Sequence, residues 1–327
     1  MRKSIDALLE VKDLHISFET AKGLLHAVNG VSYYVKKGET LGIVGESGSG
    51  KSVSAYSILG LLKPPAKIDG GDVLFEGKSV LSMGDKELLA LRGREASMIF
   101  QNPIACLDPV CTIGSQLTET VLAHDGAVSK AAARSRSIQM LSSVGIHSPE
   151  LVLRQYPFEL SGGMCQRVMI AIALLSGPKL LIADEPATAL DVTVQSQLTR
   201  LLLRLQKQNG MAMIYITHDF GILAELCDRV LVMYGGRVME QGNAGAVYYR
   251  PAHPYTRALL RALPRVDTQV KEPLTAIEGA AADPLDLPSG CVFHPRCAQC
   301  RDICREAIPT QVDVGPGHTT ACWQAIP

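Results

Sequence analysis

One stretch, residues 41–52, constrains the fold of this chain more than any other. It reads LGIVGESGSGKS, in which a short apolar run is followed by the pattern G-x-x-x-x-G-K-S and then by apolar residues at helical spacing. This order of strand, glycine-rich loop and helix is typical of phosphate binding. The glycines let backbone N–H groups point at a phosphate, and the helix start adds the positive end of its dipole. The stretch therefore predicts a nucleotide-phosphate site.

Eight residues of this stretch are expected to contact the phosphates or their metal ion. Lys51 can reach the β- and γ-phosphates of a nucleotide, and the Ser52 hydroxyl can hold Mg²⁺. The alternative is a glycine-rich turn with a chance lysine, but it does not explain why a strand pattern precedes the turn and a helical pattern follows it. The eight residues are Gly45, Glu46, Ser47, Gly48, Ser49, Gly50, Lys51 and Ser52.

The rest of the chain predicts a mainly parallel α/β core with an antiparallel β subdomain. Residues 7–19 and 26–36 alternate apolar and polar side chains, which indicates antiparallel strands. Later apolar runs alternate with helical patterns, and Pro103 is expected to stop regular structure after one of them. The pattern from about 113 to 176 is helical, and the glycine turn at 235 and 236 is expected to complete the sheet. Besides residues 7–19 and 26–36, the expected strands are 41–44, 73–75, 97–100, 180–183, 213–216 and 230–233.

Length and composition indicate one large domain followed by an appendage. The chain has 327 residues, with 47% hydrophobic and 20% charged side chains, which are the values of a soluble globular protein. We expect one large domain over residues 1–262, with a helical insert at about 104–176, and a small C-terminal extension over 263–327. Residues 264–290 are rich in proline and alanine, and they indicate a linker or a loosely packed extension.

Charge and hydropathy restrict the partners of the chain. The formal net charge is zero, so composition gives no support for a nucleic-acid partner. No run approaches the ~18 apolar residues needed to cross a bilayer, and the first residues lack the apolar region of a signal peptide. We therefore expect a cytoplasmic chain that reaches a membrane only through a partner.

Candidate catalytic side chains follow three of the expected strands. Asp184 would bind Mg²⁺ and Glu185 would polarise the attacking water, at the end of a strand expected beside the phosphate-loop strand. His218 follows the next strand, where it can contact the γ-phosphate. Gln101 ends an earlier strand, where its amide can touch Mg²⁺. Each is weak evidence alone, because acids often cap strands and single histidines are more often structural.

A second anion site is indicated by Ser-Gly-Gly at residues 161–163, which opens a long helical pattern. Ser161 suits a helix N-cap, and a helix that starts with glycines leaves its N–H groups accessible. The site lies 110 residues after Lys51 on a separate helical segment. It therefore need not face the phosphate loop of the same chain.

Taken in order, these motifs resemble those of ABC-transporter ATPases. The match comprises Gly45–Ser52, Gln101, Leu160–Gln166, Ile182–Pro186, Ala189-Leu190-Asp191 and His218. The resemblance implies a head-to-tail pair of ATPase domains, in which each MgATP lies between one phosphate loop and the other domain's Ser161–Gly163. It also implies that Phe18 stacks on adenine and that Gln166 and Asp191 belong to the nucleotide site. Met164 stands where the family usually has glutamine.

The chain is similar, more specifically, to the ATPases of oligopeptide and dipeptide importers. The stretches that carry this likeness are Met98–Gln101, Asp184–Asp191, His253-Pro254-Tyr255-Thr256 and Gly290–Cys297. The likeness implies a peripheral subunit at the cytoplasmic face of the inner membrane, with a second, related ATPase subunit, two membrane permeases and an extracytoplasmic solute-binding protein. Nickel and glutathione importers use close relatives, so these solutes stay open. A soluble ABC ATPase acting on DNA or ribosomes, and a redox- or iron-sensing regulator, are less favoured alternatives.

Five of the nine cysteines lie in the last 37 residues. In a cytosolic chain such crowding favours a metal or iron–sulfur site over disulfides. Cys291, Cys297, Cys304 and Cys322 occupy the family's four-cysteine positions, which implies a [4Fe–4S] cluster. Their gaps of five, six and seventeen residues differ from the close pairs of structural zinc, but Zn²⁺ and metal-free reduced thiols stay open. Cys300 is a spare thiol or an alternative to Cys304.

Overall fold

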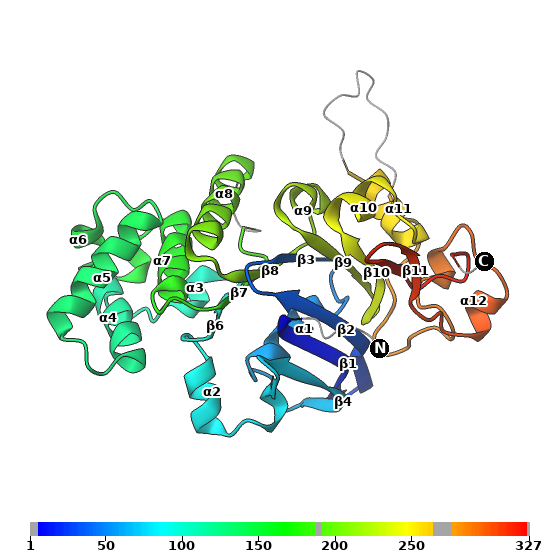
Figure 1. The fold of residues 1–327 in the computed structure, drawn as a ribbon, viewed down its shortest axis with the longest axis horizontal. Coiled ribbons are helices and arrows are strands. Elements are labelled where there is room, and N and C mark those ends of the chain that lie inside the picture. Colours follow the sequence, from blue (N-terminus) through cyan, green and yellow to red (C-terminus); the bar gives the residue numbers. More distant parts are fainter. Residues whose placement is uncertain (1–5, 188–190, 264–275, 326–327) are drawn as a thin grey trace, which may run out of the picture. The chain divides into compact units, whose positions relative to one another are not determined.

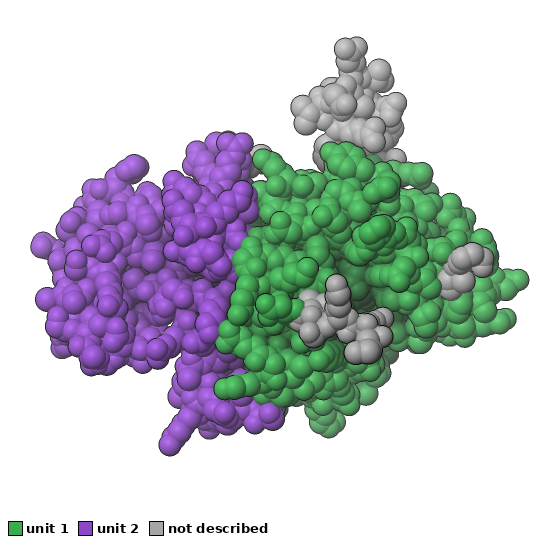
Figure 2. Space-filling view, viewed as in Figure 1, with its two compact units in different colours: residues 1–81, 215–327 green, residues 82–214 purple. Residues whose placement is uncertain are grey.

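The computed structural model describes residues 6–187, 191–263 and 276–325. The chain divides into two compact units, one formed by residues 1–81 with 215–327 and the other by residues 82–214 (Figure 2). The expected domain boundary between residues 262 and 263, and the limits of the helical insert, stay predictions. Among the described residues, no helix is long and apolar enough to span a membrane.

The first unit contains an antiparallel sheet with the strand order β2-β1-β4-β5 (Figure 1). β1 (Ala7–Thr20) pairs with β2 (Gly23–Lys36) and β4 (Ala66–Phe75), and β5 (Lys78–Ser79) pairs with β4. Most apolar positions of β1 and β2 are buried, because alternate side chains of a strand point to the same face, and Leu24 near the hairpin end is an exposed exception. The strands expected at residues 7–19, 26–36 and 73–75 are confirmed.

A second sheet of this unit carries the phosphate-loop strand. β3 (Thr40–Val44) is buried along its whole length and runs parallel to β9 (Arg229–Tyr234). Past β9 the order continues with β10 (Arg237–Asn243), β12 (His318–Thr320) and β11 (Val312–Gly315), each antiparallel to its neighbour. The parallel pair at the phosphate loop confirms the expected α/β core.

The prediction that the sheet is completed at the glycine turn after β9 is wrong. Gly235 and Gly236 have positive φ angles of 54° and 74°, which is the backbone geometry of a tight hairpin. The chain therefore returns as β10, and residues near 315 extend the same sheet. The helical elements of this unit are α1 (Lys51–Ile58), α9 (Phe220–Leu226), α10 (Ala244–Tyr249), α11 (Pro254–Arg261), α12 (Ile303–Glu306) and the 3₁₀ turn His294–Arg296.

The second unit combines two parallel strands with a run of helices. β6 (Ala96–Ile99) runs parallel to β7 (Leu180–Asp184), and both are buried along their length. The long helix α8 (Val192–Asn209) ends at Gly210, whose φ of 63° closes its last turn. β8 (Ala212–Thr217) spans the boundary between the units. Further helices are α2 (Asp85–Leu91), α3 (Pro103–Cys106), α4 (Ile113–His124), α5 (Lys130–Ser143), α6 (Pro149–Val152) and α7 (Gly162–Leu174), with a 3₁₀ turn at Pro157–Glu159. Another 3₁₀ turn, Val80–Ser82, contains the boundary between the units.

The prediction that Pro103 stops regular structure is also wrong. β6 ends at Ile99, but Pro103 is the first residue of α3. A proline at this position loses no helical hydrogen bond, because the first N–H groups of a helix have no partner inside it. The Asn102 side chain accepts hydrogen bonds from the N–H groups of Ile104 and Ala105, at 3.1 and 3.2 Å. Pro103 and the N-cap Asn102 together start the helix.

The segment expected to be a loose linker is anchored where the structure describes it. Residues 264–275 lie outside the described residues, but from 276 onward the chain packs on the first unit. The N–H of His26 in β2 donates to the carbonyl of Pro284 at 2.8 Å, and the N–H of Ala282 donates to the Tyr234 hydroxyl at 3.0 Å. These bonds fix residues 276–290 against β2 and β9.

Candidate active site

The phosphate loop joins β3 to α1, and close backbone approaches require two of its glycines. A Cβ atom on Gly45 would lie 2.1 Å from the carbonyl oxygen of Met233, and one on Gly50 would lie 2.3 Å from that of Ala27. Neither carbonyl can turn away as a flexible side chain would. Gly50 also has a φ of 93°, which glycine adopts without strain. Packing therefore restricts these positions as strictly as phosphate binding does.

The ammonium group of Lys51 lies inside the loop. Its Nζ donates to the carbonyl oxygens of Gly45 and Glu46 at 2.8 and 2.9 Å, and it lies 3.4 Å from the Ser49 hydroxyl. The side chain is buried, and Ser52 follows it in the first turn of α1. The loop carbonyls therefore hold the positive charge at the centre of the phosphate loop.

In the second unit the structure brings Gln101 into contact with the predicted catalytic residue Glu185. Asp184 is the last residue of β7 and is 2% exposed, and Glu185 follows it. The Gln101 amide Nε2 donates to Glu185 Oε2 at 3.0 Å, although 84 residues separate them. Glu185 also has a φ of 46°, a conformation that costs energy for any residue other than glycine. A strained glutamate bonded to an amide is typical of a functional site.

The predicted anion site at residues 161–163 has the geometry of an accessible helix start. Ser161 is the N-cap of α7, as the sequence predicts, and its hydroxyl accepts from the N–H of Met164 at 3.3 Å. A Cβ atom added to Gly162 or Gly163 would meet no described atom within 4 Å. The first N–H groups of α7 are therefore open to a bound group. Gln166 is 2% exposed, and its Nε2 has no hydrogen-bond partner among the described residues.

The remaining predicted nucleotide contacts lie on three separate elements. Phe18 is half-buried near the end of β1, and His218 is exposed directly after β8. Asp191 is the N-cap of α8, where its carboxylate accepts from the N–H groups of Thr193 and Val194 at 3.1 and 3.0 Å. This cap gives Asp191 a structural role of its own. Ala189 and Leu190 of the same motif lie outside the described residues.

The four predicted cluster cysteines share one small cavity of about 10 Å³, which also contacts Phe293 and Trp323. Burial, followed by the neighbouring cysteines, raises the pKa of the Cys291 thiol to about 11. A cavity of this size holds at most one water. Among the described residues, no group of three or more His, Cys, Asp or Glu side chains is arranged to hold a metal ion. The thiols are Cys291, Cys297, Cys304 and Cys322.

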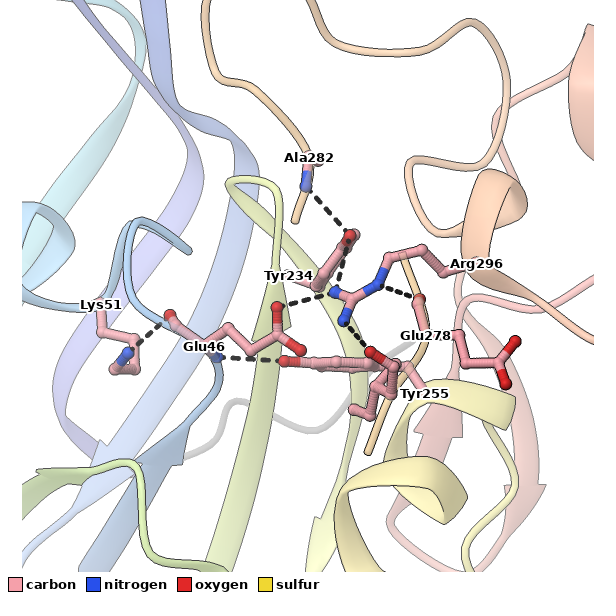
Figure 3. A network of polar contacts seen from close by, with 8 residues as sticks. Glu46, Lys51, Tyr234, Tyr255, Glu278, Ala282 and Arg296 are labelled. Atoms are coloured by element: carbon pink, nitrogen blue, oxygen red, sulfur yellow. Dashed lines mark hydrogen bonds and ion pairs between the residues drawn. The ribbon is translucent and has the colours of Figure 1, made fainter. Parts of the chain in front are cut away.

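Sequence reasoning missed the partners of Glu46. Its backbone N–H donates to the Tyr255 hydroxyl, and its carboxylate pairs with Arg296 (Figure 3). The likeness at residues 253–256 and 290–297 includes both partners, but nothing in the local sequence connects either stretch to the phosphate loop. His253 caps α11 by accepting the Tyr255 N–H at 3.0 Å, and burial lowers its pKa to about 3, so its ring is neutral near pH 7.

Two family models match the chain. The model for ABC transporter covers residues 28–188, and the model for oligopeptide/dipeptide transporter, C-terminal region, covers residues 239–304. The first includes the phosphate loop, the Ser-Gly-Gly helix start, and Asp184 and Glu185 at the end of β7. The second includes α11, Arg296 and three of the four cysteines of the cavity.

Two relatives named as peptide-transport ATP-binding proteins match nearly the whole chain. The oligopeptide transport ATP-binding protein OppD of Salmonella typhimurium is 48% identical over 98% of this chain and 95% of its own length. The dipeptide transport ATP-binding protein DppD of Bacillus subtilis is 46% identical over 98% of this chain and 95% of its own length. Among solved structures, a dimer of the ATP-binding cassette MJ0796 bound to ADP and Pi has a TM-score of 0.65 at 27% identity, over 72% of this chain and 98% of that one.

Proposed function

This chain belongs to the family of ATP-binding subunits of oligopeptide and dipeptide ABC transporters, and from that premise we propose that it hydrolyses ATP to drive peptide import. The observation that carries the proposal is the 48% identity to an oligopeptide transport ATP-binding protein, which extends over 98% of the chain. A match of this extent includes the C-terminal region as well as the ATPase motifs. The phosphate loop and the Gln101–Glu185 pair supply the chemistry that such a subunit needs.

The catalytic roles follow from the side chains that each unit presents. Lys51 would bind the β- and γ-phosphates, and Ser52 and Asp184 would hold Mg²⁺, whose charge would offset that of the phosphates. Glu185 polarises the attacking water, and its hydrogen bond from Gln101 orients the carboxylate. The other proposed nucleotide contacts are Phe18, Gly45, Glu46, Ser47, Gly48, Ser49, Gly50, Gln101, Ser161, Gly162, Gly163, Gln166, Asp191 and His218.

The accessible start of α7 supports a partner ATPase. Open space around Gly162 and Gly163 suits a phosphate supplied from another subunit, and the solved neighbour MJ0796 is described as a dimer. We assign the second half of each nucleotide site to a second, related ATPase subunit. Two permeases and an extracytoplasmic solute-binding protein complete the importer, with this chain peripheral at the cytoplasmic face of the membrane.

Peptide import is tested by reconstituting the chain with its permeases, partner ATPase and binding protein in liposomes. Addition of di- and oligopeptides is expected to raise ATP hydrolysis and to move labelled peptide into the lumen. The same preparation is then given glutathione or chelated Ni²⁺. Stimulation by one of these solutes and not by peptides would overturn the peptide assignment, while keeping the ATPase assignment.

The cysteine cavity is proposed to hold a [4Fe–4S] cluster, with Zn²⁺ as the alternative. Four thiols are the donor set that such a cluster takes, and they come from one compact unit. The partly buried Arg237 lies close enough to Cys291 for their charges to interact, which would offset thiolate charge. The cavity of about 10 Å³ requires the thiols to move apart when a cluster binds. A bound cluster would join four separate segments of the extension.

Protein purified without oxygen is expected to be brown, to absorb near 400 nm and to contain about four iron atoms per chain. Cys297→Ser is expected to lose most of this iron, because one of four ligands is removed. Cys106→Ser, at an exposed thiol outside the cavity, is the matched control and is expected to keep it. A colourless protein with one Zn²⁺ per chain would contradict the cluster and support zinc.

A further inference from the structure

Glu46, the second residue of the phosphate loop, is held from two sides by residues far along the chain. Its backbone N–H donates to the Tyr255 hydroxyl at 3.0 Å. Its carboxylate Oε2 accepts from Nη1 of Arg296 at 2.7 Å, across 250 residues of sequence (Figure 3). Main chain and side chain of one loop residue therefore have separate anchors, and the C-terminal region supplies both.

Arg296 is itself fixed by its surroundings. Its Nε donates to the carbonyl of Glu278 and its Nη2 to that of Ile277, both at 3.0 Å, and Nη1 lies 3.3 Å from the Tyr234 hydroxyl (Figure 3). The side chain is 7% exposed. A guanidinium group is planar and presents its donors in a rigid fork. Because Nε and Nη2 are bonded to two backbone carbonyls, the guanidinium holds the Glu46 carboxylate at a set position.

Tyr255 is an equally rigid anchor. The side chain is fully buried, and its ring centroid lies 4.7 Å from that of Tyr234 and 5.1 Å from that of Phe293. Burial raises the pKa of its hydroxyl above the ordinary range, so the group stays neutral and can accept the N–H of Glu46. Because α11 begins at Pro254, the ring is placed by the helix and by the packed aromatic side chains around it.

Arg296 and Tyr255 are connected to the Lys51 ammonium through the backbone of the phosphate loop. Lys51 donates to the carbonyl oxygens of Gly45 and Glu46. The Gly45 carbonyl belongs to the same peptide unit as the N–H held by Tyr255, and the Glu46 carbonyl begins the next peptide unit. A shift of Glu46 therefore moves both acceptors of the Lys51 ammonium. We propose that Arg296 and Tyr255 are positioning residues for nucleotide binding, acting through Glu46 on Lys51. The C-terminal region thus sets the affinity of the phosphate loop for ATP.

The expected signature is weaker ATP binding with unchanged maximal turnover. Lys51 is expected to contact the phosphates in the ATP complex and in the transition state alike. A displaced loop would therefore weaken binding of both states equally. Such a loss raises KM without lowering kcat. Loss of a hydrogen bond to a charged group corresponds to about tenfold in affinity. Arg296→Gln is expected to raise the Kd and KM for MgATP by about this factor, and Tyr255→Phe, which loses a neutral hydrogen bond, by about fivefold. In both variants kcat is expected within about twofold of wild type.

The experiment measures MgATP binding with a fluorescent ATP analogue, and steady-state ATPase kinetics in the assembled transporter. Arg296→Lys keeps the charge but not the fork, and it is expected to restore part of the affinity. Arg301→Gln, at an exposed arginine of the same region, is the matched control and is expected to bind ATP as wild type does. Wild-type affinity in both Arg296→Gln and Tyr255→Phe would overturn the proposal.

A double variant separates positioning from a general loss of stability. If Arg296 acts through Glu46, then Glu46→Gln alone raises the Kd, and adding Arg296→Gln raises it little further. Fully additive effects would show that Arg296 acts by another route and would overturn the proposal. The inference rests on the ATP binding proposed above. A wild-type chain that bound no ATP would refute that function, whereas equal affinities in variant and wild type would refute only the positioning role.

Discussion

Glu185→Gln is expected to lower ATP turnover at least about 100-fold while leaving ATP binding intact, because a neutral amide cannot polarise the attacking water as a carboxylate does. The substitution keeps the size of the side chain and an oxygen that can accept the hydrogen bond of Gln101. The strained backbone at this residue, with φ at 46°, is the same for both side chains. The variant should therefore fold normally and hold ATP without hydrolysing it.

The measurement pairs a single-turnover ATPase assay with retention of radiolabelled ATP on the assembled transporter. We expect the variant to retain ATP and to favour the closed pair of ATPase subunits, which size-exclusion chromatography detects. Glu225→Gln changes an exposed glutamate of α9 in the same chemical way and serves as the control. Wild-type turnover in the Glu185 variant would remove this residue from the catalytic role.

Gly163→Asp is expected to abolish most ATP hydrolysis by the assembled transporter, by about 100-fold or more, while the isolated chain binds ATP normally. The new side chain has room, since a Cβ atom at this position meets no described atom within 4 Å. A carboxylate in the first turn also stabilises α7 through the helix dipole. The defect therefore comes from negative charge placed where a phosphate from the partner subunit is expected.

Two assays separate this outcome from misfolding. Thermal unfolding of the isolated chain should show equal or slightly higher stability, and its Kd for MgATP should match wild type within about twofold. Gly163→Ala adds a side chain without charge and is expected to keep most of the activity. Hydrolysis at the wild-type rate by the aspartate variant would mean that this helix start does not contact nucleotide.

Features governed by local rules could be predicted from the sequence. The strand, glycine loop and helix at residues 40–58 follow from a short pattern, and the structure places them as expected. Ser161 was predicted as an N-cap because its side chain can reach N–H groups only three residues away, and it does so. Local chemistry also explains why Pro103 was misjudged, since a proline can begin a helix as readily as it ends a strand.

Features that depend on distant contacts could not be predicted. Glu240 in β10 is fully buried and pairs with His318 at 2.7 Å, across 78 residues, while its other oxygen accepts the N–H of His253. No neighbouring residue distinguishes this glutamate from one exposed on an edge strand. The pairing of β10 with β12 and the ion pair of Arg296 with Glu46 are likewise not indicated by the neighbouring sequence. Each becomes visible only when the complete fold brings the two segments together.

The 250 residues between Glu46 and Arg296 also set an order of events during synthesis. A ribosome that adds about 5–20 residues per second needs roughly 10–50 s to make Arg296 after Glu46 has been made. Throughout that interval the nascent chain has a phosphate loop without its distal support. Capture of cellular ATP by growing chains would then be weak, and tight binding would begin only when the region that contains Arg296 has folded. If the positioning role holds, the ion pair would link nucleotide affinity to completion of the fold.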